Sequence, residues 1–207
     1  YLPADAKHFN TTLGEWGEDA NKHNKDKWYQ TSRSGYSLVV QLNFCSEHNY
    51  RYFQLLKPQW RHAGVFNYAG HPVNKGKYYT MAWARVDVDF NTNEAIIEEI
   101  QTDWLRNLRQ LIADVKENDK RISGDFLIRN GIGSSAQNLM AYYSFMRNYF
   151  EMWQEAILSL SIEVLQKEIG VEHIFMHTHE SGNLFKEITY RQPPKSLYSK
   201  LPTKMGF

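Results

Sequence analysis

The chain has 207 residues, 42% of them hydrophobic and 23% charged, which suits a domain with a sizeable buried core. Its 24 Lys and Arg residues nearly balance its 23 Asp and Glu residues, so net charge does not indicate nucleic acid or an anionic membrane as a partner. No apolar run approaches the ~18 residues of a membrane-spanning helix. The single cysteine, Cys45, excludes an intrachain disulfide and predicts a reducing, cytoplasmic location.

Residues 1–35 are polar, with scattered aromatic side chains and no strong periodicity. We predict that they form an irregular N-terminal extension, with a short helix near residues 11–24. This extension is expected to pack on a single domain that spans residues 36–207. Because the chain begins at Tyr1 rather than at Met, we expect it to be part of a larger polypeptide.

The strand patterns begin at residues 36–44, which are rich in β-branched and other apolar side chains. Residues 47–60 fit neither the strand period nor the helical period. Apolar and polar side chains alternate towards the end of residues 78–90, and residues 94–101 form a second β-patterned run. The Asn-containing tripeptide 91–93 between these runs is a turn signal, so we predict an antiparallel hairpin.

Helical patterns dominate the rest of the chain. Apolar side chains recur at spacings of three and four in residues 103–117 and, most strongly, in residues 149–169. Gly170 ends the second helix, and residues 171–178 follow as a buried strand. A last short helix is predicted over residues 195–201. Together these elements predict an α/β (α+β) fold with a mixed, mostly antiparallel sheet flanked by helices.

Polar and amphipathic groups gather where the second hairpin strand gives way to the helix that follows it. Binding and catalytic groups commonly lie at such strand ends. One interpretation is that Gln101, Asp103 and Trp104 bind a substrate or partner. The other is that Thr102 or Asp103 caps the helix and that the group only fixes the strand–helix corner.

Two histidines mark the end of the later strand. His177 and His179 are two residues apart, which places both side chains on one face of a strand. They are either surface residues of a polar strand end or contacts for a substrate or partner. A zinc-type site needs a third ligand, from Glu180 or Asp103, which the spacing does not specify. We therefore assign no metal ligands, and a metal-dependent hydrolase that uses His177 and His179 remains a third alternative.

Two stretches resemble the same group of proteins. Residues 97–104, with the sequence Ile-Glu-Glu-Ile-Gln-Thr-Asp-Trp, resemble the EEIQSDW block of uncharacterised phage and mobile-element proteins, with Thr102 in place of its usual Ser. Residues 149–178 resemble the second block of those proteins. The resemblance implies a module of a large polypeptide and carries no activity with it.

The second half of the chain also resembles GNAT-type acyltransferases, which end in a helix with a tyrosine shortly before a Gly-Phe pair. Here these are Tyr198 and residues 206–207. The resemblance implies acyl transfer from acetyl-CoA or another acyl-CoA to a small-molecule or protein amine. It implies Tyr198 as the acid that protonates the departing thiolate, and Glu98 or Glu99 as the base that neutralises the amine. Neighbouring strand residues face opposite sides, so we expect only one glutamate in the cleft.

The coenzyme-binding signature of that family is altered here. The family has Arg or Gln, two residues, Gly, one residue, and then Gly or Ala directly after the hairpin, where backbone N–H groups hold a pyrophosphate. Residues 102–106 contain no glycine. A similar run, one residue short, comes well downstream and comprises Arg129, Gly131, Gly133 and Ser134. Either a helix is inserted before the coenzyme loop, or the fold is kept without coenzyme binding.

Two functions follow from these alternatives. An acyltransferase-like enzyme is expected to have a pair of strands that separate to form a cleft. A non-catalytic binding or assembly module is expected to lack this separation and to fill the cleft with its own side chains.

Overall fold

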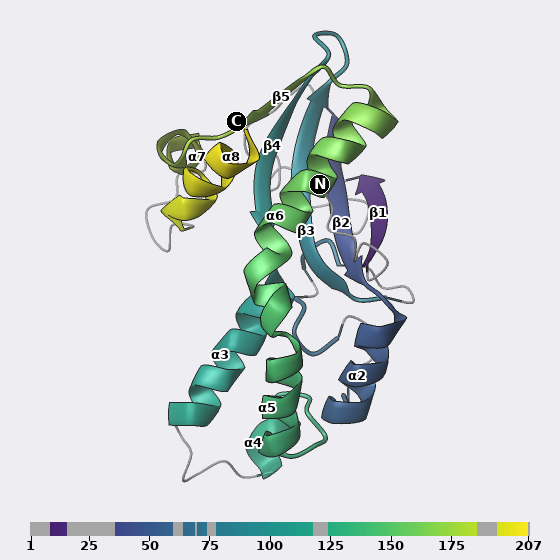
Figure 1. Cartoon of the computed structure of the whole chain (residues 1–207), viewed down its shortest axis with the longest axis vertical. Coiled ribbons are helices and arrows are strands. Elements are labelled where there is room, and N and C mark those ends of the chain that lie inside the picture. Colours follow the sequence, from purple (N-terminus) through teal and green to yellow (C-terminus); the bar gives the residue numbers. More distant parts are fainter. Residues whose placement is uncertain are drawn as a thin grey trace.

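Among the residues that the structure describes, five strands form one mixed sheet in this computed structural model of the chain (Figure 1). The described residues are 9–15, 36–59, 64–68, 70–73, 78–117, 124–185 and 194–206. In sheet order the strands are β1 (Phe9–Glu15), β2 (Tyr36–Phe44), β3 (Thr80–Asp89), β4 (Glu94–Gln101) and β5 (His173–Met176). β1, β2, β3 and β4 pair with one another in antiparallel fashion, and β5 pairs in parallel with β4. The predicted α+β fold with a mostly antiparallel sheet is confirmed.

The helices flank this sheet and extend beyond one end of it (Figure 1). They are α2 (Ser46–Leu56), α3 (Asp103–Glu117), α4 (Gly124–Arg129), α5 (Ala136–Phe145), α6 (Arg147–Glu163), α7 (His179–Phe185) and α8 (Lys200–Met205). A π-helical segment, Val164–Ile169, continues α6, and a 3-10 turn, Lys195–Leu197, precedes α8. Within the described ranges, no helix combines the length and apolar character needed to cross a membrane.

The β3–β4 hairpin, α3 and α6 confirm the predicted elements, and Gly170 ends the α6 segment with a φ of 81°. The ambiguous residues 47–60 contain α2, whose buried side chains His48, Tyr52 and Leu56 lie one turn apart. A buried histidine in this stripe concealed the helical period. Ser135 accepts a hydrogen bond from the Asn138 N–H and caps α5.

The expected helix near residues 11–24 is wrong for residues 11–15, which belong to β1; the remainder lies outside the described residues. β1 forms because β2 supplies both backbone and side-chain partners. The Thr12 hydroxyl donates to Gln41 Oε1 at 2.5 Å and accepts from Asn43 Nδ2 at 2.9 Å. Neither interaction can be read from the β1 sequence alone.

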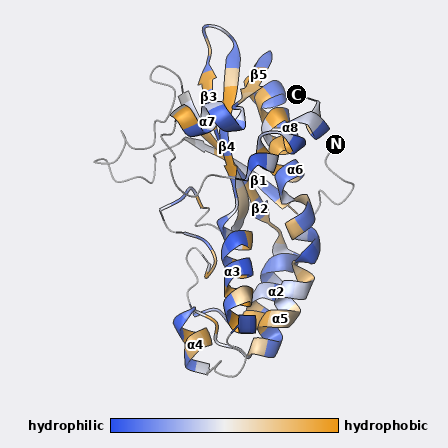
Figure 2. Ribbon diagram, turned by 90° about the vertical axis from the view of Figure 1, so that its left-hand side faces the viewer, coloured by the Kyte–Doolittle hydropathy of each residue, from blue (hydrophilic) through white to orange (hydrophobic). Residues whose placement is uncertain are grey.

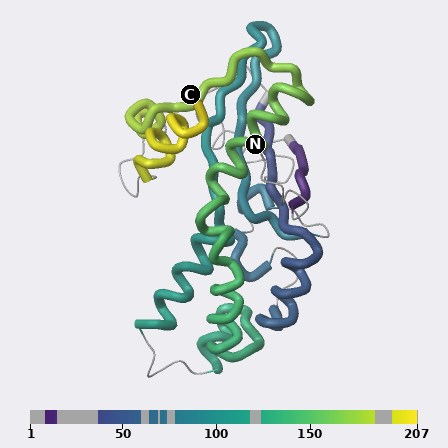
Figure 3. Tube along the Cα trace, viewed as in Figure 1, coloured from purple at the N-terminus to yellow at the C-terminus, as the bar shows by residue number. Residues whose placement is uncertain are grey.

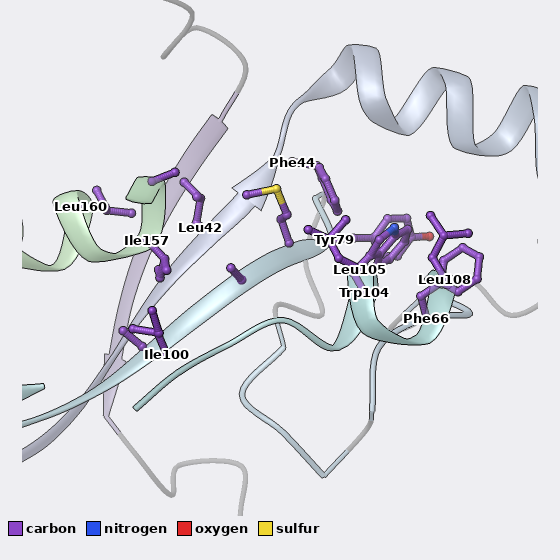
Figure 4. Packing of buried hydrophobic residues seen from close by; sticks show 14 of the residues in the cluster. Leu42, Phe44, Phe66, Tyr79, Ile100, Trp104, Leu105, Leu108, Ile157 and Leu160 are labelled. Atoms are coloured by element: carbon purple, nitrogen blue, oxygen red, sulfur yellow. The ribbon is translucent and has the colours of Figure 1, made fainter. Parts of the chain in front are cut away.

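The hydrophobic core is one cluster with two adjoining parts (Figure 4). In the first, α6 packs Ile157 and Leu160 against the sheet face that carries Leu42 and Ile100. In the second, beyond the end of the sheet, Trp104 is surrounded by a set of rings whose centroids lie 5.0–5.4 Å from its own: Phe44, His48, Tyr52, Phe66 and Tyr79. Figure 2 shows hydrophilic residues along α3, whose apolar side is the one that packs inward.

Candidate functional site

A β-bulge interrupts the pairing of β3 with β4. Arg85 lies opposite Glu99 and Val86 lies opposite Ile97, so Glu98 is the extra residue of the bulge. Arg85 Nη2 lies 3.7 Å from Glu98 Oε2, and Arg85 Nε donates to Glu99 Oε1 at 3.2 Å. Both carboxylates therefore face the same side of the sheet. The expectation that these two glutamates face opposite sides is wrong, because a bulge breaks the strand alternation.

β4 and β5 separate at this bulge. Their parallel pairing joins residues 94–97 to residues 173–176, after which the chain leaves the sheet and enters α7. His177 lies at the point of separation, where its Nε2 is 3.2 Å from Glu98 Oε2. Both side chains are buried. The sequence-predicted residues Glu98, Glu99 and His177 are thus brought together by the end of strand pairing.

Tyr198 reaches the same place from the C-terminal segment, between the 3-10 turn and α8. Its ring centroid lies 6.0 Å from that of His179, at the start of α7. Gly182 of α7 allows this close packing: a Cβ at Gly182 would lie 3.3 Å from His177 Cβ and 3.7 Å from Tyr198 Cε1. Burial raises the pKa of Tyr198 to about 12, and the negative charges of Glu99 and Glu98 add to the increase.

Asp87 lies two residues along β3 from Arg85, on the same face, and is also buried. Burial raises the pKa of Asp87 to about 6; Glu98 adds to the increase, whereas the Ser37 hydroxyl and Arg85 oppose it. Asp87 therefore keeps its proton to a higher pH than an ordinary aspartic acid does.

We refer to these six residues as the bulge cluster: Arg85, Asp87, Glu98, Glu99, His177 and Tyr198. Its single guanidinium is set against three carboxyl groups, so the cluster carries excess negative charge when they are ionised. Such a site attracts a cation. The sequence prediction missed Arg85 and Asp87, although three charged residues, Arg85, Asp87 and Asp89, alternate with valines in the second half of this strand.

Asp103 anchors a second polar group at the start of α3. Its buried carboxylate accepts hydrogen bonds from His71 Nδ1 at 2.7 Å and from Arg106 Nη2 at 2.5 Å. The Gln101 amide nitrogen lies 3.1 Å from Asp103 Oδ1 and 3.2 Å from His71 Nδ1. His71 was missed from the sequence because it belongs to a loop remote from Asp103 along the chain.

Thr102 and Trp104 have structural roles at this strand–helix corner. Thr102 Oγ1 accepts from the Leu105 N–H at 3.2 Å, as an N-cap does, and donates to the Met81 carbonyl at 2.5 Å. Trp104 is fully buried, and its Nε1 donates to Tyr142 Oη at 2.9 Å. A fully buried indole offers no surface to a ligand, so Trp104 fixes the corner rather than contacting a substrate or partner.

The glycine-containing run begins at the last residue of α4 and leads to α5, at the end of the molecule away from β5, α7 and α8 (Figure 3). It comprises Arg129, Gly131, Gly133 and Ser134. Its backbone N–H groups bond internally: Gly131 donates to the Ile128 carbonyl at 2.9 Å and Gly133 to the Leu56 carbonyl at 3.1 Å. A Cβ at Gly133 would lie 2.6 Å from the Lys57 carbonyl oxygen, so close packing against the end of α2 requires glycine there.

Neither position predicted for a coenzyme pyrophosphate fits that group. At the run between α4 and α5, the N–H groups of Gly131 and Gly133 are already used. At the N-terminus of α3, the buried Asp103 carboxylate carries the same sign of charge as a phosphate. Neither position is therefore assigned as a pyrophosphate site.

A surface hollow lies away from both polar groups. A hollow of about 620 Å³ between α3, α5 and α6 is lined by Arg109, Tyr143, Ser144, Arg147, Phe150 and Glu151. Over the part of the chain that the structure describes, no group of three or more His, Cys, Asp or Glu side chains is placed to hold a metal ion.

No protein-family model, curated protein or solved structure matches this chain. Function therefore has to be inferred from the geometry of the bulge cluster.

Proposed function

We propose that this chain is an acyltransferase-like domain with a GNAT-like fold, and that the bulge cluster binds the acceptor amine. The observation that carries the proposal is the bulge at Glu98. It brings two glutamates together with His177 and Tyr198, from separate elements, where β4 and β5 separate. β5 ends at Met176 while β4 continues to Gln101, and this parting of the two strands is the feature that supports the enzyme.

The two glutamates have different access to a ligand. The Glu99 side chain is 24% exposed, whereas that of Glu98 is wholly buried against Arg85 and His177. We therefore assign Glu99 to contact with the amine and Glu98 to holding Arg85 and His177 in place. A protonated amine is drawn to the excess negative charge of the cluster, and its proton has to be removed before attack.

The transfer itself forms one bond and breaks one. The neutral amine nitrogen attacks the acyl carbonyl carbon of a thioester donor, the carbon–sulfur bond breaks, and the sulfur leaves as a thiolate with the electron pair. The nitrogen, which becomes positively charged on attack, gives up its second proton to solvent to form the neutral amide. Tyr198 is protonated at neutral pH, because its pKa is raised to about 12. A thiol has an ordinary pKa of about 8.5, so Tyr198 stabilises the departing sulfur by donating a hydrogen bond rather than by giving up its proton.

A second candidate is a non-catalytic binding or assembly module of a phage or mobile-element protein. It is favoured by one specific observation, the internal use of the N–H groups of Gly131 and Gly133. In that case the bulge cluster would bind an amine, such as a lysine side chain, without turnover.

Thermal-shift titrations separate these functions, using acetyl-CoA, free coenzyme A and a panel of primary amines. A ligand at a hundred times its Kd stabilises the fold by about 2.7 kcal/mol. A saturable shift with an amine, together with thiol release from acetyl-CoA in its presence, supports the enzyme. An amine shift without thiol release supports the binding module. A protein that no amine stabilises refutes both assignments of the cluster.

A matched pair of variants ties the result to the site. Glu99→Gln keeps the size of the side chain and removes its charge, so amine binding is expected to weaken at least tenfold. Glu117→Gln makes the same change at an exposed position at the end of α3 and is expected to bind the amine as the unmodified chain does.

A further inference from the structure

We infer that His71, oriented by Asp103, is the general base that removes the proton of the amine bound at Glu99; this inference rests on the proposed function. His71 Nδ1 lies 2.7 Å from Asp103 Oδ2, and the Asp103 side chain is wholly buried. A carboxylate in this position holds the proton on Nδ1. The lone pair is then on Nε2, the other ring nitrogen.

The His71 ring remains accessible to a ligand. Its side chain is 18% exposed, and no hydrogen bond from the described residues reaches Nε2. Trp83 holds one side of the ring, with centroids 5.4 Å apart, and the exposed Tyr68 meets it edge-on at 4.9 Å. The ring is therefore fixed in orientation while one nitrogen stays open.

The pair lies on the same sheet face as the bulge cluster. Trp83, against which His71 packs, is two residues from Arg85 on β3, and Gln101 is two residues from Glu99 on β4. Two residues of a strand span about 7 Å, so Glu99 and the His71–Asp103 pair are neighbours on this face. The proposal requires the ammonium group anchored at Glu99 to lie towards His71, within reach of its Nε2.

A base other than Glu99 is needed for a chemical reason. Glu99 already accepts a hydrogen bond from Arg85 Nε, so we assign it to anchoring the ammonium group rather than to taking up its proton. An imidazole accepts and returns protons near neutral pH. The charged and titratable groups that face His71 are Asp103 and Arg106 from α3, Tyr68 from its own loop and, further along the face, the bulge cluster.

Loop anchoring alone does not account for this arrangement. The loop that carries His71 is already held to the sheet by Gln41, whose Nε2 donates to the Pro72 carbonyl at 2.7 Å. A histidine with one nitrogen bonded to a buried carboxylate and the other open is the arrangement that general-base catalysis requires.

The deciding experiment measures kcat/KM for acyl transfer from acetyl-CoA to the amine identified by thermal shift, between pH 5.5 and 9. The His71→Asn side chain can still donate to Asp103 but has no basic nitrogen. We expect it to lower kcat about 10²- to 10⁴-fold and to remove the acidic limb of the profile. Added imidazole should restore part of the rate, which a merely structural role would not allow.

The controls separate the two proposals. His173→Asn, at an exposed position of β5, should leave the profile unchanged. His71→Asn with full turnover and an unchanged acidic limb would overturn the role of His71 while leaving the proposed function intact. Absence of transfer by the unmodified chain overturns both. Should His71→Asn unfold, Asp103→Asn serves instead, and a change of the pH profile in the folded variant is the supporting result.

Discussion

His48 provides the sharpest quantitative prediction about stability. It lies on α2, is fully buried and stacks on Phe44 with ring centroids 3.5 Å apart. Its Nε2 lies 2.7 Å from Tyr142 Oη. The same Tyr142 oxygen accepts a hydrogen bond from Trp104 Nε1. Tyr142 therefore donates its proton to His48, whose ring is neutral. Burial lowers the pKa of His48 to about 3.

The sign of the effect follows from proton binding. As pH falls below the ordinary value of 6.5, the unfolded chain protonates this histidine, but the folded chain does not until about pH 3. Above about pH 7, His48 is neutral in both the folded and the unfolded chain, so this effect on stability is absent. As the pH falls from about 6.5 to about 3, the free energy of unfolding decreases. Integrating over the two pKa values gives a loss of about 2 kcal/mol at pH 5 and about 3 kcal/mol at pH 4.

Urea denaturation at pH 7.5, 5 and 4 tests this prediction in the unmodified chain and in His48→Phe. The variant lacks the acceptor for the Tyr142 hydroxyl and should be less stable at pH 7.5 by about 1–3 kcal/mol. Its free energy of unfolding should fall less than that of the unmodified chain, by about 2 kcal/mol at pH 5. Tyr142→Phe keeps the histidine and should keep the steeper dependence. Parallel losses of stability in His48→Phe and the unmodified chain would refute a neutral, buried His48.

Three further predictions concern other sites. Gly133→Ala should lower the free energy of unfolding by about 1–3 kcal/mol in urea, because its Cβ meets the Lys57 carbonyl, whereas Gly124→Ala, with open space around its Cβ, should change it little. The raised pKa of Asp87 stabilises the fold below about pH 4, and this contribution is lost as pH rises through 6; Asp87→Asn should therefore be the more stable chain above pH 6 in the same assay. Tyr198→Phe should lower turnover about tenfold to a hundredfold and leave the melting temperature nearly unchanged; equal turnover would remove it from the reaction.

The sequence correctly predicts the elements in which apolar residues recur without interruption at the spacing of a strand or a helix. The hairpin, α3 and α6 belong to this group, as does the stop at Gly170. α2 was obscured because a histidine takes a core position, and a polar residue in that position breaks the pattern by which helices are recognised. β1 was missed because its stability comes from β2, to which it is hydrogen-bonded across a long separation in sequence.

The candidate site was predictable only in part. Glu98, Glu99, His177 and Tyr198 were identified one by one, but their meeting depends on where β4 and β5 stop pairing, which no local pattern specifies. The run from Arg129 to Ser134 was predicted as a coenzyme-binding loop, but Gly133 is there because two backbone segments pack closely against each other. Close backbone packing and phosphate binding both favour glycine, so the sequence alone cannot distinguish them.

The bulge itself has a physical cause that the sequence does contain. Ala95, Ile97 and Ile100 are all buried on the α6 side of the sheet, with a spacing of two and then of three. A regular strand cannot place Ile97 and Ile100 on one face, and exposing either would forfeit about 1.5–3 kcal/mol of apolar burial. The extra residue resolves this conflict and turns both Glu98 and Glu99 to the opposite face, where Arg85 offsets their mutual repulsion. Packing on one side of β4 thus assembles the charged site on the other.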